Sequence, residues 1–272
     1  MELVTASEGT SVKPSEFRLW TNRREFLNTS LVAAWVALCL YVVCLANAYL
    51  DRINPSLYSL HHPRLPDPLL DFLSPYYLRS GLAPDLADQL VQFGPVFILL
   101  RPLLMREKAL LVLRRQFFII GACYLVRAVF VLITILPNPL ASCKTKLSNS
   151  IFYDAFLQFI QLRTSCGDVL FSGHTIVFLI SALSWSTYPF SLITTCIAWA
   201  FASLGIMVLI ASTYHYTVDC VVGVMVVSLI WKLYHSTVTS HHDNSFSKLL
   251  YQLDAEHHFD IEYERCRESE YP

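Results

Sequence analysis

The sequence predicts an all-α membrane protein with six transmembrane helices and both termini in the cytosol. Of its 272 residues, 54% are hydrophobic and only 15% are charged, whereas a soluble domain of this length carries about 25% charged residues. The mean hydropathy of +0.46 agrees with a chain that lies largely in lipid. The formal net charge of −1 supplies no basic face for nucleic acid, so we expect the lipid bilayer and no nucleic acid as a partner.

Six apolar segments are long enough to cross about 30 Å of hydrocarbon at about 1.5 Å per helical residue. The second is the weakest, since Gly94, Pro95 and Pro102 interrupt it. The chain is thus expected to divide into an N-terminal tail (1–26), a six-span core (27–236) and a polar C-terminal tail (237–272). The six segments lie at 27–49, 86–105, 116–136, 170–188, 191–212 and 216–236.

Lysine and arginine predict the orientation, because cytoplasmic segments carry an excess of them near the span ends. Both tails are expected in the cytosol, which leaves 50–85, 137–169 and 213–216 on the outer side. In the C-terminal tail, Cys266 is either a lipidation site or a plain exposed cysteine. The residues that set the bias precede the first span or lie around the loop after the second: Lys13, Arg18, Arg23, Arg24, Arg101, Arg106, Lys108, Arg114 and Arg115.

Two polar clusters interrupt the apolar pattern, both at the expected outer ends of spans. One runs over 166–175 and contains His174, and the other runs from His215 to Asp219. The order of the spans places both histidines on the same face of the membrane, where ionisable residues are costly and commonly functional. Two hydrogen-bonded histidines with a purely structural role at the interface are the alternative interpretation.

The spacing within the clusters favours chemistry on a phosphate. His215 and Asp219 are four residues apart, so on a helix they share one face. The carboxylate can hold one imidazole N–H, which fixes the tautomer and raises the basicity of the other nitrogen. Ser172 can cap the helix that begins at this point, and Gly173 lets backbone N–H groups approach a phosphate oxygen.

A lone arginine, Arg127, lies in the middle of the third span, one turn after Tyr124. In hydrocarbon it must face a polar cavity or a partner. It contacts either a lipid phosphate or a buried structural acceptor. Cys143 and Cys166 both fall in the outer loop before the fourth span, so a disulfide between them is possible. The alternative is that Cys166 packs or hydrogen-bonds within the site.

These ordered motifs resemble the lipid phosphatase/phosphotransferase superfamily and, in their fuller form, the sphingomyelin synthase family. The family's C-G-D-x-x-x-S-G-H-T motif is similar to 166–175, and its H-Y-T-x-D motif to 215–219. Its P-P-L-P-D motif appears at 63–67 with arginine in the second place. The resemblance covers about 60–236. The family's motif of two arginines followed by Tyr, Arg and Thr matches Arg114, Arg115, Tyr124, Arg127 and Thr134.

The resemblance implies a transferase that moves phosphocholine from phosphatidylcholine to the primary hydroxyl of ceramide, giving sphingomyelin and diacylglycerol. It implies His215 as the nucleophile, Asp219 as the group that holds it and His174 as the general acid and base, with no metal or other cofactor. It also implies the Golgi apparatus or plasma membrane, with the site facing the lumen or exterior; homo-oligomer formation stays open. The expected substrate-binding residues are Asp168, Ser172, Gly173, Arg127 and Tyr124.

The sequence leaves the head group open, so ceramide phosphoethanolamine synthase and inositol phosphorylceramide synthase are alternatives. A lipid phosphate phosphatase is less favoured. That class carries an arginine six residues before the second histidine to clamp a terminal phosphate, and here Leu209 stands at that position. A non-enzymatic membrane scaffold is a third alternative, against which the intact histidine cluster argues.

Overall fold

The computed structural model describes residues 23–53, 64–83, 85–105, 108–140, 143, 145–239 and 250. Within these residues the chain forms eight helices and no strand, which confirms the all-α class. The expectations for most of the two tails, including the one on Cys266, lie outside the described residues. The helices are α1 (Arg23–Ile53), α2 (Pro68–Arg79), α3 (Leu86–Leu104), α4 (Ala109–Ile133), α5 (Ile151–Phe159), α6 (Gly173–Thr187), α7 (Leu192–Ala211) and α8 (Thr217–Thr239).

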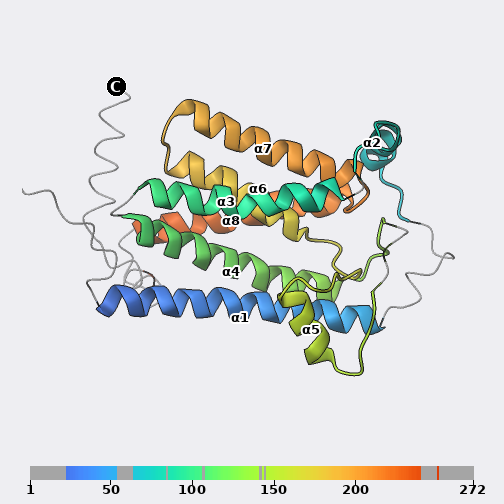
Figure 1. Ribbon diagram of the computed structural model, residues 1–272, viewed down its shortest axis with the longest axis horizontal. Helices are drawn as coiled ribbons and strands as arrows, with labels where there is room; N and C mark the ends of the chain where they lie inside the picture. The colour runs from blue at the N-terminus through green and yellow to red at the C-terminus, as the bar shows by residue number, and fades with distance from the viewer. Residues whose placement is uncertain are drawn as a thin grey trace, which may run out of the picture.

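Six of these helices, α1, α3, α4, α6, α7 and α8, run side by side as a bundle, while α2 and α5 lie toward one end of it (Figure 1). Among the described residues, α1, α4, α7 and α8 are long and apolar enough to cross a membrane, so the chain is an integral membrane protein. The 15 residues of α6 extend only about 22 Å, less than the roughly 30 Å of hydrocarbon. The number of spans and the cytosolic placement of the termini remain predictions.

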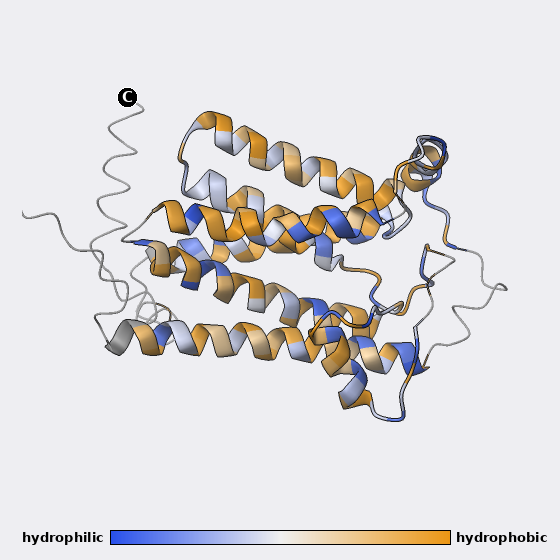
Figure 2. Ribbon diagram, in the orientation of Figure 1, coloured by the Kyte–Doolittle hydropathy of each residue, from blue (hydrophilic) through white to orange (hydrophobic). Residues whose placement is uncertain are grey.

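The bundle is hydrophobic on its outside as well as in its core, as expected for helices in lipid. Figure 2 shows mostly hydrophobic residues along the bundle helices and hydrophilic residues more often toward the two ends. Ile119, Ile180 and Val227 are fully buried where α4, α6 and α8 meet, whereas Ile193 and Met225 are exposed. Small residues allow close approach of the helices: at Gly205 on α7, a Cβ would overlap the ring of Phe178 on α6.

Two helices fall in segments that the sequence analysis treated as outer loops. Asp67 caps α2 by accepting a hydrogen bond from the Leu70 N–H, and Pro68 fills the first position of the helix. Ser150 caps α5 in the same way. Both helices are too short to span a membrane, so a search for long apolar segments passes over them. A third difference is that α6 begins at Gly173 rather than at 170, because the preceding backbone is irregular.

Candidate active site

The two histidines of the polar clusters face each other at the end of the bundle that carries α2. His174 lies in the first turn of α6, and His215 lies in the turn between α7 and α8. Their ring centroids are 5.6 Å apart, well within the about 10 Å over which both rings can reach one phosphate group. The expected proximity of the two clusters is therefore confirmed.

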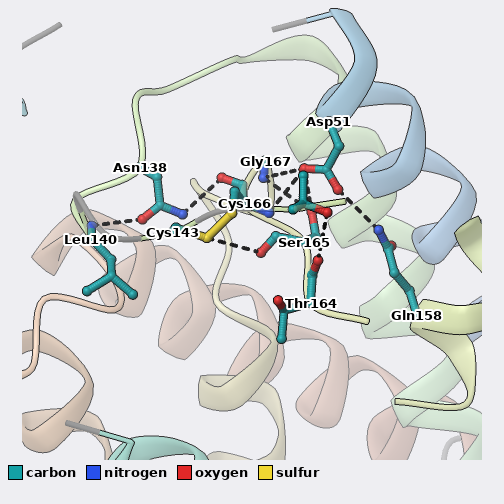
Figure 3. The surroundings of a disulfide bond; sticks show 10 residues. Asp51, Asn138, Leu140, Cys143, Gln158, Thr164, Ser165, Cys166 and Gly167 are labelled. Atoms are coloured by element: carbon teal, nitrogen blue, oxygen red, sulfur yellow. Dashed lines mark hydrogen bonds between the residues drawn. A yellow bond between two sulfur atoms is a disulfide. The ribbon is translucent and has the colours of Figure 1, made fainter. Parts of the chain in front are cut away.

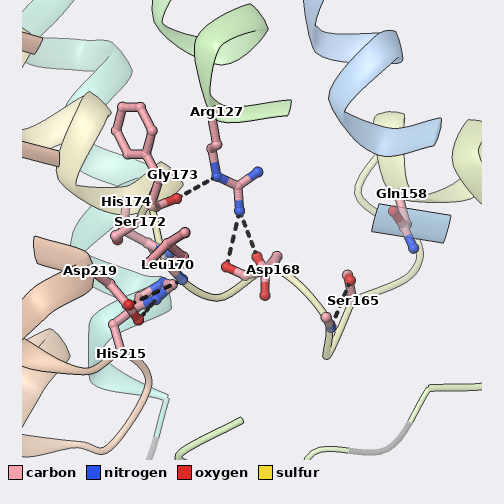
Figure 4. Close-up of polar contacts among 12 residues, drawn as sticks. Arg127, Gln158, Ser165, Asp168, Leu170, Ser172, Gly173, His174, His215 and Asp219 are labelled. Carbon is pink, nitrogen blue, oxygen red and sulfur yellow. Dashed lines mark hydrogen bonds and ion pairs between the residues drawn. The ribbon is translucent and has the colours of Figure 1, made fainter. Parts of the chain in front are cut away.

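A buried carboxylate orients the second histidine. Asp219 is 0% exposed, and its Oδ2 lies 3.3 Å from Nδ1 of His215. The same Oδ2 accepts the N–H of Tyr216 at 3.0 Å. Oδ1 accepts the N–H of Leu170 at 3.0 Å (Figure 4). The expected contact is present, but His215 precedes α8 instead of sharing a helical face with Asp219. Because Nδ1 points to the carboxylate, Nε2 is the nitrogen suited to attack.

Sequence reasoning missed a second carboxylate, Asp88 in the first turn of α3. Its Oδ1 lies 2.9 Å from Nε2 of His174, and its Oδ2 accepts the hydroxyl of Tyr214 at 2.9 Å. Burial of the phenol, together with this carboxylate, raises the pKa of Tyr214 above its ordinary value. An acidic residue at the outer end of a span was the signal that could have pointed to Asp88.

Arg127 on α4 binds the segment that leads into α6. The arginine is 3% exposed. Its Nε donates to the carbonyl of Phe171 at 2.7 Å, and its Nη2 donates to Oδ2 of Asp168 at 3.0 Å and to that residue's carbonyl at 3.3 Å. Figure 4 shows the Asp168 side chain directed at the guanidinium. The sequence leaves a lipid phosphate and a protein acceptor open as partners of Arg127, and in the structure this arginine binds the protein acceptor Asp168.

The remaining expected substrate-binding residues lie around the N-terminus of α6. The Ser172 side chain accepts the N–H of Thr175 at 3.2 Å, which confirms the predicted helix cap. Tyr124 donates its hydroxyl to the carbonyl of Gly173 at 3.4 Å. Each of these contacts fixes the start of α6, and therefore fixes the position of His174 one residue later.

A disulfide and a buried carboxylate hold the beginning of the same segment. Cys143 and Cys166 form a disulfide with Cα atoms 5.9 Å apart, which decides between the two alternatives for Cys166. Asp51, near the end of α1, accepts the backbone N–H groups of Cys166 and Gly167, both at 3.0 Å (Figure 3). Gln158 on α5 donates to the other oxygen of Asp51 at 3.1 Å.

Asp67 joins the segment 64–67 to the start of α8. Its carboxylate accepts the N–H of Thr217 at 2.6 Å and the Thr217 hydroxyl at 2.8 Å, in addition to capping α2. Burial opposes ionisation of this carboxyl, but the hydrogen bonds from Thr217 and α2 outweigh it and hold the pKa of Asp67 below its ordinary value. One side chain thus fixes two helix starts, one of them two residues after His215.

Comparison with known proteins gives one family model and several relatives for this chain. The family model described as PAP2 superfamily C-terminal matches residues 165–236, a stretch that contains both histidine clusters. The chain is 27% identical over 206 residues to sphingomyelin synthase-related 2 of Caenorhabditis elegans, covering 68% of this chain and 62% of that protein. It is 28% identical over 204 residues to phosphatidylcholine:ceramide cholinephosphotransferase 2 of Rattus norvegicus, covering 68% of this chain and 53% of that protein.

The human phosphatidylcholine:ceramide cholinephosphotransferase 1 is 28% identical over 152 residues, which cover 51% of this chain and 37% of that protein. The matched part of the chain thus spans between a third and three fifths of the length of these relatives. The matches and the PAP2 segment therefore show that the chain is similar to sphingomyelin synthases and contains a segment that matches the PAP2 superfamily C-terminal model.

Proposed function

We propose that this protein transfers phosphocholine from phosphatidylcholine to the primary hydroxyl of ceramide, with the site on the lumenal or exterior face of a Golgi or plasma membrane. One observation carries the proposal. In a chain that spans the membrane, His215 is held through Nδ1 by a buried carboxylate, and His174 faces it at 5.6 Å between ring centroids. This is the arrangement of a nucleophile with its orienting group and a nearby acid–base residue.

In the first half-reaction, Nε2 of His215 attacks the phosphorus of phosphatidylcholine. The new P–N bond forms as the P–O bond to diacylglycerol breaks, and His174 gives its proton to the departing oxygen. Phosphocholine remains on His215. Asp219 stabilises the positive charge that develops on the His215 ring.

In the second half-reaction, His174 accepts the proton of the ceramide hydroxyl, whose oxygen attacks the same phosphorus. The P–O bond to ceramide forms as the P–N bond breaks, which releases sphingomyelin and restores both histidines. Asp88 Oδ1, 2.9 Å from Nε2 of His174, holds that ring in position through both steps. Acid–base assistance of this kind contributes roughly a hundred- to ten-thousand-fold in rate.

The residue six positions before His215 favours a phosphodiester substrate over a phosphate monoester. Leu209, which occupies the position where a phosphatase carries its clamping arginine, is fully buried and belongs to an apolar cluster to which α2, α3, α6, α7 and α8 contribute. A dianionic phosphate needs more positive charge than a phosphodiester, and a buried leucine supplies none. We therefore propose a transferase rather than a lipid phosphate phosphatase.

The test uses purified protein in liposomes with fluorescent ceramide and one donor lipid at a time: phosphatidylcholine, phosphatidylethanolamine or phosphatidylinositol. Thin-layer chromatography should show fluorescent sphingomyelin from phosphatidylcholine, and no product from His174→Ala or His215→Ala. Cys196→Ser, at an exposed free cysteine of α7, is the matched control and should retain full activity. A product from phosphatidylethanolamine or phosphatidylinositol alone would overturn the head-group assignment, and no ceramide product from any donor would overturn the transferase.

Asp88 provides a second test of the proposed mechanism. Asp88→Ala should lower the turnover number about a hundred-fold, because His174 loses the carboxylate that holds its ring in position. Tyr214→Phe removes only the hydroxyl that binds the other oxygen of Asp88 and should cost less. Equal turnover in Asp88→Ala and the wild-type protein would exclude this role.

A further inference from the structure

Helix α2 has two apolar faces, although only one of them packs against the protein. The packed face consists of Leu70, Ser74 and Tyr77, all buried. These side chains lie against the end of α7, where Leu70 and Tyr77 join the apolar cluster that contains Leu209. Packing against the bundle therefore accounts for one side of the helix only.

The second apolar face is exposed. Leu69, Phe72 and Tyr76 are 38%, 62% and 60% exposed, and the two aromatic rings lie 5.5 Å apart. At about 100° per residue, this stripe is rotated by roughly 130° from the packed face. A third face carries Asp71, which forms an ion pair with Arg64. The helix thus has one face packed against protein, one exposed stripe with two aromatic rings, and a third side on which the Asp71–Arg64 ion pair lies beside the exposed Leu78.

We propose that α2 lies in the monolayer on the side of the membrane that holds the two histidines, with the Leu69–Phe72–Tyr76 stripe in contact with lipid. In Figure 1 the bundle helices run across the view, whereas α2 is seen nearly along its own axis at the end of the bundle. A helix in that position and direction lies parallel to the membrane plane. Interfacial helices bury such an apolar face about 5–10 Å deep, and aromatic side chains favour the level of the head groups.

If α2 lies in the monolayer, it sets the depth at which the active site lies in the membrane, an inference that rests on the proposed function. Asp67 caps α2 and also binds the backbone and hydroxyl of Thr217, the first residue of α8. His215 lies two residues before that point. A helix anchored at the head-group level therefore holds the nucleophile at the level of the lipid phosphates.

The position of α2 can be measured without any assay of activity. A fluorescent amino acid is incorporated at Phe72 in one sample and at Asp71 in a matched control, both in lipid nanodiscs. The Phe72 probe should be quenched mainly by lipids that carry a nitroxide near the head group, and the Asp71 probe mainly by iodide in the water. Equal iodide quenching of the two probes would overturn the proposed contact with lipid.

The effect on depth is tested with the double variant Phe72→Ser/Tyr76→Ser and the control Asp71→Ser. In nanodiscs the double variant should lose at least about ten-fold in sphingomyelin formation, because small displacements of reacting groups are costly. In detergent micelles, where no bilayer sets the depth, both variants should match the wild type. Equal loss in both media, or no loss in either, would overturn the depth-setting role. An inactive wild-type protein would overturn the proposed function and leave the quenching result standing.

Discussion

Replacing Asp219 by asparagine tests the proposed nucleophile most directly, because the two side chains have the same shape. Both carboxylate oxygens of Asp219 are acceptors: Oδ1 takes the N–H of Leu170, while Oδ2 takes the N–H of Tyr216 and contacts Nδ1 of His215. An amide has only one oxygen. In either orientation of the substituted amide, therefore, its NH2 group would face a backbone N–H that is also a donor.

The two orientations differ in what they do to His215. If the amide oxygen of Asp219→Asn faces Leu170, the NH2 group faces Nδ1 and holds the wrong tautomer. If the oxygen keeps its contacts with Tyr216 and His215, the tautomer is preserved but the negative charge is lost and the N–H of Leu170 has no acceptor there. A buried unsatisfied donor costs about 1–3 kcal/mol of stability. The corresponding substitution in serine proteases lowers turnover by about ten-thousand-fold.

We therefore expect Asp219→Asn to lower sphingomyelin formation by roughly a hundred- to ten-thousand-fold in the liposome assay, which corresponds to about 3–5 kcal/mol of barrier. Binding of the variant to liposomes should persist. His215→Ala should be at least as damaging, and the double variant scarcely worse than His215→Ala, since groups that act together are not additive. Asp71→Asn is the control on an exposed carboxylate. Near-full activity of Asp219→Asn would refute the orienting role.

Three further predictions concern stability, measured as Tm in detergent. Gly205→Ala should lower Tm by several degrees, because its Cβ would overlap an aromatic ring of α6; Gly173→Ala, with its nearest atoms at 3.5 Å, should not. Reduction of the disulfide should lower the Tm of the wild type, through a loss of up to about 3 kcal/mol in the free energy of unfolding, and should leave the Tm of Cys143→Ser unchanged. Asp67→Asn should lower Tm at pH 7. The folded pKa of Asp67 lies below the ordinary 3.8, so its contribution is present above that value and lost as pH falls through the folded pKa, and the difference in Tm should shrink in acid.

Each of these stability predictions has a contrary outcome. Equal Tm values for Gly205→Ala and the wild type would mean that α6 and α7 separate readily at this contact. A loss of Tm on reduction in Cys143→Ser would assign the effect to something other than this disulfide. A constant difference between Asp67→Asn and the wild type throughout the acid range would show that the carboxylate charge is not what holds Thr217.

Much of the bundle follows from the sequence because lipid requires long apolar segments. The expected segment 86–105 corresponds to α3 (Leu86–Leu104), and 191–212 corresponds to α7 (Leu192–Ala211). The order of the spans was also enough to bring His174 and His215 together. Helices α2 and α5 escaped prediction because their stability depends on packing and on caps at Asp67 and Ser150, rather than on length.

The carboxylates that complete the site were harder to foresee. Asp88 is 86 residues from His174 in sequence, and Asp51 is 115 residues from Cys166. Their roles depend on which helices become neighbours, α3 beside α6 and α1 beside the loop before α6. A single sequence contains the charge of each residue but not that choice of neighbours.

The irregular backbone ahead of α6 also has a consequence for how the protein is made. In this segment the carboxylate of Asp51 accepts the N–H groups of Cys166 and Gly167. Arg127 donates to the carbonyl of Phe171. The carboxylate of Asp219 accepts the N–H of Leu170. Non-helical backbone is tolerated near hydrocarbon only when such partners are present. The ribosome synthesises α1 and α4 before this segment, but Asp219 follows Leu170 by 49 residues. We therefore expect the segment before α6 to adopt its final structure only after α8 has entered the membrane, which makes it the last part of the bundle to assemble during biosynthesis.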